Sequence, residues 1–237
     1  MPAAERVIVA LDVRDLAGLE AFFDRLEGQA RFCKVGLELF VAEGAAAVEA
    51  AQRRGSKVFL DLKLHDIPET VARAVASATS LGAELLTVHT AGGFEMVRRA
   101  AHAARESAKG RPRILGVTVL TSLSEEDLRA DGIGGGMREA VVRRARLAEK
   151  AGAAGVVCSP QEVADVRAAS RTLALVVPGV RPAGTALGDQ KRVATPACAI
   201  AAGADYLVVG RPIRDATSPA AAFAGIVAEV EAALAEG

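Results

Sequence analysis

The chain has 237 residues with 29 basic and 29 acidic side chains, so its formal net charge at pH 7 is zero. This balance, with an aromatic content of only 3%, argues against an extended nucleic-acid-binding surface. Hydrophobic residues make up 51% of the sequence, but charged residues interrupt them every few positions, so no membrane-spanning segment is predicted.

The amino terminus and the cysteines bear on the compartment in which the protein works. The first residues lead almost at once into an apolar run, without the charged, apolar and cleavage regions of a signal peptide. Cys33, Cys158 and Cys198 are odd in number and widely separated. We therefore predict buried, reduced thiols in a cytoplasmic protein.

Short β-branched runs alternate with alanine-rich amphipathic segments along the whole chain. The predicted strands are 7–11, 32–36, 57–61, 85–89, 114–119, 155–158, 173–177 and 206–209. The predicted helices include 15–26, 39–54, 70–81, 94–108, 137–151 and 219–234. This alternation, with no linker between the segments, predicts one (β/α)8 TIM barrel, a closed parallel eight-stranded sheet, as a single domain over residues 1–237. An open doubly wound sheet is the alternative, but the turn after the first strand lacks the expected glycine.

Polar residues follow nearly every predicted strand at its carboxyl end, where the active sites of such barrels lie. In chain order they are Asp12, Lys34, Asp61, Lys63, Asp66, His89, Thr121, Ser159, Pro178, Arg181, Gly210 and Arg211. The amino-terminal ends of the strands carry fewer such residues, so we expect the functional site at the carboxyl end.

The third predicted strand runs directly into charged residues. Alternation along a strand places Asp61 and Lys63 on one face, and buried charges cost several kcal/mol each unless they are paired. Lys34 lies on the neighbouring strand, roughly 5 Å away, and Asp66 follows three residues after Lys63. A row of alternating charge favours protonated lysines, and a lysine of this kind can protonate a developing carbanion. The alternative is a structural network that only fixes the barrel register.

Asp66 has a second interpretation. Followed by Ile67, Pro68 and Glu69, it fits the N-cap of a capping box, with proline in the first turn and an acid at the third helical position. The two roles compete for one carboxylate.

The loops after the seventh and eighth strands are the usual phosphate site of this architecture. Pro178 and Arg181 follow one strand, and Gly210 and Arg211 follow the other. Glycine allows close approach of the backbone, and the two arginines supply positive charge. The small residues of the segment 183–190 predict a mobile lid over the ligand.

Other polar residues are given simpler interpretations. His65, His89 and His102 show no metal-ligand spacing, so no zinc site is predicted. Arg143, Arg144 and Arg146 are interpreted as the solvated face of a helix.

Several ordered motifs together resemble the orotidine 5′-phosphate decarboxylases in their bacterial form, over essentially the whole chain. The most specific is Asp61-x-Lys63-x-x-Asp66-Ile67-Pro68-x-Thr70, although Glu69 stands where the family commonly has Asn. It is supported by 10–12, 34–36, 117–122, 178–182, 188–192 and 209–213.

The resemblance implies conversion of orotidine 5′-monophosphate to UMP and CO2, the last step of UMP synthesis, without metal or cofactor, in a homodimer with shared sites. It implies that Lys63 protonates C6 beside Asp61. The further implied roles are ribose binding by Asp12 and Lys34, a contribution of Asp66, Ile67 and Thr70 from the partner subunit, contact of Thr121 with the pyrimidine, and phosphate binding by Arg181, Gln190, Gly210 and Arg211, with Pro178 in the same loop.

Two other functions remain open from the sequence. A magnesium-dependent sugar-phosphate lyase, such as a ketogulonate-phosphate decarboxylase or a hexulose-phosphate synthase, resembles the same Asp-x-Lys-x-x-Asp strand. A catalytically silent barrel that binds nucleotide phosphates is the second alternative, although the intact Lys63 argues against it.

Overall fold

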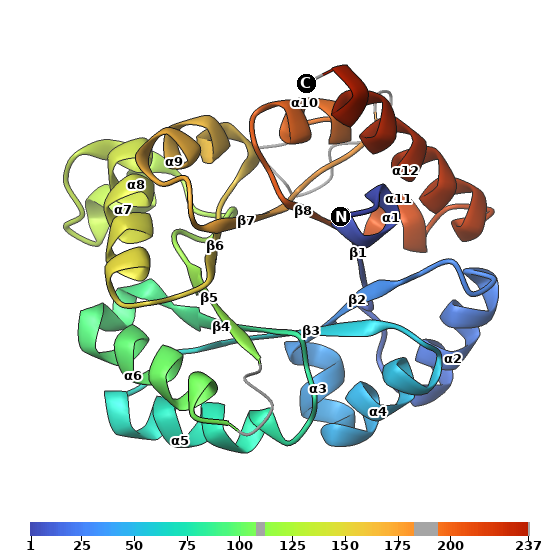
Figure 1. Cartoon of the computed structure of the whole chain (residues 1–237), viewed down its shortest axis with the longest axis horizontal. Helices are drawn as coiled ribbons and strands as arrows, with labels where there is room; N and C mark the ends of the chain where they lie inside the picture. The colour runs from blue at the N-terminus through green and yellow to red at the C-terminus, as the bar shows by residue number, and fades with distance from the viewer. Residues whose placement is uncertain (108–111, 183–193, 237) are drawn as a thin grey trace.

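The computed structural model describes residues 1–107, 112–182 and 194–236. Eight parallel strands pair in chain order, and β8 pairs back with β1 to close the barrel. Figure 1 shows the helices ringing this sheet. The predicted (β/α)8 barrel is therefore confirmed. The strands are β1 (Val7–Ala10), β2 (Phe32–Gly36), β3 (Lys57–Leu64), β4 (Leu85–His89), β5 (Arg113–Val117), β6 (Gly155–Val157), β7 (Ala174–Pro178) and β8 (Tyr206–Val209).

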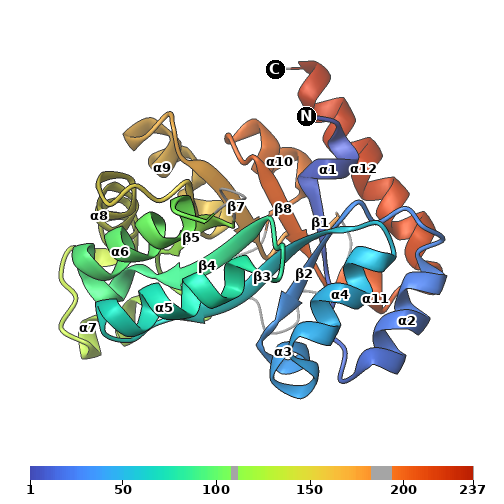
Figure 2. The ribbon, with the colours of Figure 1, turned by 60° about the horizontal axis from the view of Figure 1, so that its bottom comes forward.

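The helices cover the outside of the sheet, and α1 lies against α12, close to both chain ends (Figure 2). The helices are α1 (Ala3–Arg6), α2 (Leu16–Arg25), α3 (Leu37–Glu43), α4 (Ala45–Arg53), α5 (Pro68–Thr79), α6 (Gly93–Arg105), α7 (Glu125–Ala130), α8 (Gly136–Lys150), α9 (Val163–Ala169), α10 (Pro196–Ala201), α11 (Arg211–Arg214) and α12 (Pro219–Glu236). Two 3-10 helices, η1 (Thr90–Gly92) and η2 (Pro160–Glu162), follow β4 and β6. Within the described part of the chain, no helix has the length and apolarity that a membrane crossing requires.

The predicted elements differ from the structure in two main places. The single helix expected over 39–54 is wrong, because Gly44 has φ +57° and separates α3 from α4. The third strand is longer than expected: β3 runs to Leu64 with a register shift against β4 between Leu60 and Leu64. Five helices of four to seven residues, α1, α7, α9, α10 and α11, were not predicted.

Two apolar layers hold the barrel together. The larger lies between the strands and the helices, and the smaller fills the inside of the sheet. Inside, the rings of Phe32 and Tyr206 meet edge to face, with centroids 5.8 Å apart. The interior is therefore a packed core, as in other barrels of this kind. Its members are Ile8, Ala10, Phe32, Phe59, Leu85, Leu115, Val176, Tyr206 and Val208.

All three cysteines are free thiols. Cys33 and Cys158 are buried, as expected, and burial raises the pKa of the Cys33 thiol to about 12, which keeps it protonated and unreactive. Cys198 is exposed, so the prediction that all three are buried is wrong for this residue.

Candidate active site

The interior core determines which charged side chains enter the barrel. Phe32 and Phe59 point inward, and residues two positions further along a strand share the same face. Lys34 and Asp61 therefore stand directly above these two rings, on neighbouring strands at the carboxyl end of the sheet. The layer below them is apolar apart from the Tyr206 hydroxyl, which bonds to Arg113, so other side chains at the carboxyl end compensate these two charges.

A series of ion pairs forms at this end. Lys34 Nζ lies 3.1 Å from Asp12 Oδ1 and 3.8 Å from Asp61 Oδ2. Lys63 Nζ lies 2.8 Å from the same Asp61 oxygen. Asp61 is only 8% exposed, so two ammonium groups, more than water, compensate its charge. The structure thus joins three of the four residues of the row expected from the sequence and adds Asp12.

Lys63 reaches Asp61 through an unusual backbone conformation. Its φ is +49°, in the left-handed region that costs a residue other than glycine about 1–3 kcal/mol. The register shift between β3 and β4 accommodates this residue, so simple strand alternation does not extend through Lys63. The sequence-based reasoning from alternation placed the two side chains together correctly, but by the wrong geometry.

Thr87, in β4, secures this conformation. Its Oγ1 accepts a hydrogen bond from the backbone N–H of Lys63 at 2.9 Å and donates one to Asp61 Oδ1, also at 2.9 Å. Thr87 is fully buried, so water does not compete for these bonds. The sequence analysis missed this residue, because a threonine inside a strand is ordinary and only the β3–β4 register would have indicated its role.

Gly36 was also missed. A Cβ atom at this position would lie 2.8 Å from Lys34 Nζ, which is closer than real Cβ contacts. A side chain at residue 36 would therefore displace the ammonium that lies between Asp12 and Asp61.

Two histidines lie beside Lys63. The rings of His65 and His89 stack, with centroids 5.3 Å apart and planes 20° from parallel. Burial first, and then the neighbouring charges of His65, Arg144 and Lys63, together lower the pKa of His89 to about 4. The His89 ring is therefore neutral at pH 7, and its Nδ1 accepts a hydrogen bond from the backbone N–H of Ala91 at 3.2 Å.

The interpretation of Arg143, Arg144 and Arg146 as a solvated helix face is wrong for Arg144. Its Nη1 donates a 2.6 Å hydrogen bond to the backbone oxygen of Thr118, and burial lowers the pKa of its guanidinium. Arg143 and Arg146 are exposed, as expected. Among the residues described, no group of three or more His, Cys, Asp or Glu side chains is arranged to hold a metal ion.

Asp66 does not join the ion pairs of its own chain. It is exposed, its Oδ1 accepts from the neighbouring backbone N–H of Ile67 at 2.6 Å, and in the described ranges it forms no ion pair. The capping interpretation is wrong, because α5 begins at Pro68 with Ile67 at the N-cap and no side-chain cap. Glu69 instead pairs with Arg73 and Arg99.

The next two residues of the motif also face outward. Ile67 is 66% exposed, which is unusual for an isoleucine next to a charged cluster, and Thr70 is exposed as well. Asp66, Ile67 and Thr70 therefore form an exposed set at the start of α5.

A cavity of about 360 Å³ adjoins the ion pairs. Its walls combine the end of β1, Lys34, and the loops after β7 and β8, so it contains the predicted Asp12, Lys34, Pro178, Arg181, Gly210 and Arg211. The structure thus brings the two expected phosphate loops together beside the ion pairs. Thr121 lies outside the lining of this cavity, in the loop after β5. Gln190 and the predicted lid 183–190 lie outside the described residues.

Gly210 and Arg214 shape one wall of the cavity. A Cβ atom at Gly210 would lie 3.3 Å from Asp12 Oδ2 and 3.5 Å from Ala10 Cβ, so glycine keeps this wall open. Arg214, which the sequence analysis did not single out, donates from Nη1 to the backbone oxygen of Asp12 at 3.0 Å and pairs with Asp215. It therefore ties the loop after β8 to the end of β1.

Comparisons with protein families, protein sequences and solved structures each find orotidine 5′-phosphate decarboxylases. The model of the family described as "Orotidine 5′-phosphate decarboxylase / HUMPS family" matches residues 5–226. The chain is 58% identical to the orotidine 5′-phosphate decarboxylase of Anaeromyxobacter sp. (strain K), over 96% of this chain and 99% of the relative. It is 51% identical to that of Moorella thermoacetica, over 98% and 94%. The crystal structure of the Lactobacillus acidophilus orotidine 5′-phosphate decarboxylase superposes with a TM-score of 0.83 at 37% identity, covering 94% of this chain and 98% of that one.

Proposed function

The chain belongs to the orotidine 5′-phosphate decarboxylase / HUMPS family, and we propose that it converts orotidine 5′-monophosphate to UMP and CO2. One observation carries the assignment of the chemistry: the Lys63 ammonium is held 2.8 Å from a buried carboxylate at the carboxyl end of the barrel. Barrel enzymes place their reacting groups at that end.

Lys63 is assigned as the acid. When the bond between C6 and the carboxylate breaks, its electron pair stays on C6 in the plane of the ring, where the π-system cannot delocalise it. A positioned ammonium stabilises such a charge as it develops. The proton then passes from Lys63 Nζ to C6, and the neutral amine regains a proton from solvent.

Asp61 and Lys34 are assigned to keep that ammonium in place. Asp61 Oδ2 accepts from Lys63 Nζ at 2.8 Å, and Thr87 fixes the other carboxylate oxygen. Because these partners are set before substrate arrives, little reorganisation is needed at the moment of reaction. Lys34 and Asp12 border the cavity and are assigned to the ribose hydroxyls.

The loops after β7 and β8 are assigned to the phosphate. Arg181 and Arg211 line the same cavity, and Gly210 keeps its wall open. Phosphate binding far from C6 supplies binding energy that can orient the pyrimidine for reaction. Pro178 shapes this pocket, Gln190 is assigned to the phosphate from outside the described residues, and Thr121 is assigned to the edge of the pyrimidine.

A second copy of the chain is proposed to complete each site. Asp66 is exposed and unpaired within the described part of its own chain, and Ile67 is 66% exposed beside it. An apolar side chain next to an unmatched carboxylate suits a surface that a partner covers. We therefore assign Asp66, Ile67 and Thr70 to the site of the neighbouring subunit of a cytoplasmic homodimer.

Mixing two inactive variants tests the shared site. Asp66→Asn and Lys63→Ala each remove one group from every site of a homodimer. In a mixed dimer of the two variants, one of the two sites regains both groups. When equal amounts of the two variants exchange at random, about half of the dimers are mixed, so about a quarter of the activity of wild-type enzyme at the same total concentration is expected. Activity is measured as loss of orotidylate absorbance, and dimer exchange by native mass spectrometry. Mixed dimers that stay inactive would contradict sharing.

The same absorbance assay with and without EDTA separates the proposed reaction from a magnesium-dependent sugar-phosphate lyase. Turnover of orotidylate that chelator leaves unchanged is the expected result. Turnover that EDTA abolishes would favour the lyase chemistry, and ligand binding without any CO2 release would favour the silent phosphate-binding barrel.

A further inference from the structure

A second cavity lies at the opposite end of the barrel. It measures about 960 Å³, against about 360 Å³ for the cavity at the candidate active site. Its lining includes Arg6, just before β1, Arg113, at the start of β5, and the residues leading into β7 and β8. All of these are amino-terminal strand ends, so this cavity is separate from the ion pairs around Lys63.

Arginine dominates the charge of this cavity. Arg6, Arg113, Arg167 and Arg171 line it, and Asp205 is the one acidic residue in the lining given by the described residues. Glu84 approaches Arg113 from outside the lining, with its Oε1 3.8 Å from Nε. Even with Glu84 counted, four guanidinium groups face two carboxylates. The cavity therefore has an excess of positive charge, although the whole chain has none.

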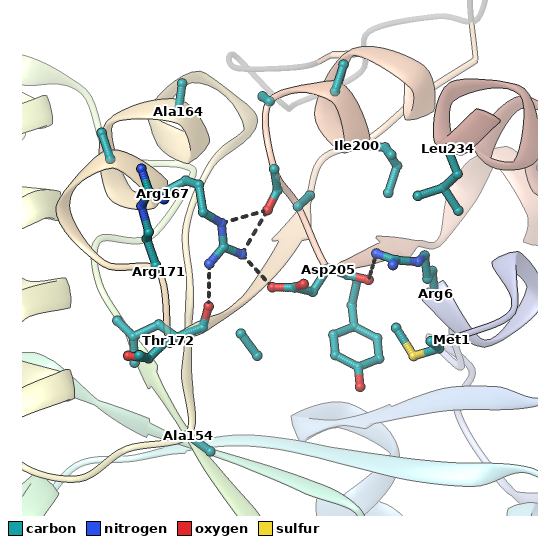
Figure 3. A pocket seen from close by; sticks show the side chains of 18 of the residues that line it. Met1, Arg6, Ala154, Ala164, Arg167, Arg171, Thr172, Ile200, Asp205 and Leu234 are labelled. Carbon is teal, nitrogen blue, oxygen red and sulfur yellow. Dashed lines mark hydrogen bonds and ion pairs between the residues drawn. The ribbon is translucent and has the colours of Figure 1, made fainter. Parts of the chain in front are cut away.

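Arg167 is the structural member of the group. Its Nη2 lies 2.6 Å from Asp205 Oδ2, and its three nitrogens donate to the backbone oxygens of Gly203, Ser170 and Leu173. In Figure 3, dashed lines join the Arg167 guanidinium to Asp205 and to nearby backbone oxygens. The hydrogen-bonding capacity of Arg167 is thus used within the protein.

Arg6 and Arg113 use much less of theirs. A guanidinium has five N–H donors. Arg6 makes one long hydrogen bond, from Nη1 to the backbone oxygen of Asp205 at 3.4 Å, and Arg113 donates from Nη2 to Tyr206 Oη at 3.0 Å. The Nε atoms of both are buried and have no hydrogen-bond partner among the described residues. The other Nη N–H groups of Arg6 and Arg113 have no acceptor among the described residues, so an anionic ligand in the cavity can accept from them.

Arg171 adds a third available guanidinium. It is exposed at the mouth of the cavity and has no hydrogen bond or ion pair in the ranges that the structure covers.

Arg6 and Arg113 bond to the successive residues Asp205 and Tyr206, so their two guanidinium groups meet at one short segment. Convergent arginines are the arrangement that binds phosphate oxygens.

The remaining wall is apolar. Ile200 and Leu234 lie together on one side of the cavity in Figure 3, and the lining also includes several alanines. A ligand site that combines apolar walls with a few convergent polar groups suits a molecule with an anionic end and an uncharged body.

We propose that this cavity is a second ligand site, distinct from the active site, that takes a phosphorylated molecule of nucleotide size. Its phosphate groups are bound by Arg6, Arg113 and Arg171, and its uncharged part lies against Ile200 and Leu234. Arg167 and Asp205 form the rigid floor.

Calorimetric titration tests the proposal. The enzyme is first saturated with UMP to occupy the active site, and is then titrated with ATP, inorganic pyrophosphate or adenosine. ATP is expected to bind with one site per chain and more tightly than pyrophosphate, because only ATP contacts both walls. Adenosine alone should show no binding. Equal affinity for ATP and pyrophosphate would overturn the apolar half of the site, and absence of binding by either would overturn the whole proposal.

Matched variants locate the binding. Arg171→Gln, whose side chain makes no contact that folding needs, should weaken ATP binding about tenfold, and Arg6→Gln with Arg171→Gln about a hundredfold. Arg129→Gln removes an exposed arginine of α7 and should leave affinity unchanged. Turnover of orotidylate should be the same in all three. Equal weakening by Arg129→Gln, or none by the Arg6/Arg171 pair, would mean non-specific anion binding only and would contradict the site.

Discussion

The two ends of this barrel both carry charged side chains, but they differ in how those charges are matched. At the carboxyl end, Asp61 lies between Lys34 and Lys63, and each charge has an opposite neighbour. At the amino end, Arg167 is matched by Asp205, while Arg171 has no partner in the described ranges. Matched charges fix a geometry, and unmatched charges keep a capacity to bind. The first condition suits a reaction and the second suits a ligand site.

Removal of a lysine at each end of β3 sharpens this comparison most strongly. Lys63→Ala should lower kcat by at least about four orders of magnitude, because it removes both the proton donor and the stabilising charge. UMP affinity should change by no more than roughly tenfold, since the phosphate loops are intact. The measurements are orotidylate absorbance for kcat and calorimetry for UMP.

Lys57 is the matched control at the amino end of the same strand. It is an exposed lysine whose Nζ lies 2.7 Å from Glu5 Oε2. Exposed ion pairs of this kind contribute little to stability, so Lys57→Ala should keep normal turnover. If Lys63→Ala turned over at a near-normal rate, the assignment of the acid would fail.

The buried Thr87 provides the next largest expected effect. Thr87→Val keeps the shape of the side chain but removes both hydrogen bonds, one to the Asp61 carboxylate and one from the strained Lys63 backbone. Loss of a hydrogen bond to a charged group costs about 1.5–3 kcal/mol, so kcat should fall about 10- to 100-fold. KM should change little, and Thr87→Ser should restore most of kcat.

Thr118→Val separates this role from simple destabilisation. Thr118 is equally buried and donates to the backbone oxygen of Val157 at 2.8 Å, away from the ion pairs. Both valine variants should lose stability to a similar degree in thermal unfolding. Equal losses of kcat in the two variants would mean that Thr87 acts only through the stability of the barrel.

The sequence predicted the general arrangement because two strong patterns agree. Short β-branched runs recur at regular spacing between amphipathic segments, and polar residues follow nearly every run at its carboxyl end. The pairing of Lys34 with Asp61 could be expected because each interrupts an apolar run, on strands predicted to be neighbours roughly 5 Å apart. These features depend on short-range periodicity, which a single sequence displays directly.

Two of the three details that escaped prediction depend on tertiary contacts. A positive φ at Lys63 is unfavourable locally and persists because Thr87 and the register shift support it. The break at Gly44 is invisible in an amphipathic pattern that continues across it. Arg144 has the composition of a solvated helix face, yet it reaches the Thr118 carbonyl. For Lys63 and Arg144 a partner distant in sequence overrides the local preference, whereas the break at Gly44 is local, with its N–H bonded to the Phe40 oxygen.

The smallest expected effect is a pH dependence of stability from His89. Burial lowers its pKa to about 4, whereas an unfolded histidine titrates near 6.5. Between these values the unfolded chain binds more protons, so the free energy of unfolding decreases as the pH falls from 6.5 to 4. His89→Phe should reduce this slope in urea unfolding measured across that range. His102→Phe removes an exposed histidine that lies 4.0 Å from Glu106 and should leave the slope unchanged. If the free energy of unfolding of His89→Phe depended on pH as strongly as that of the wild type, other groups would cause the acid sensitivity. The stacked pair of His65 and His89 would then make no contribution to the pH dependence of stability.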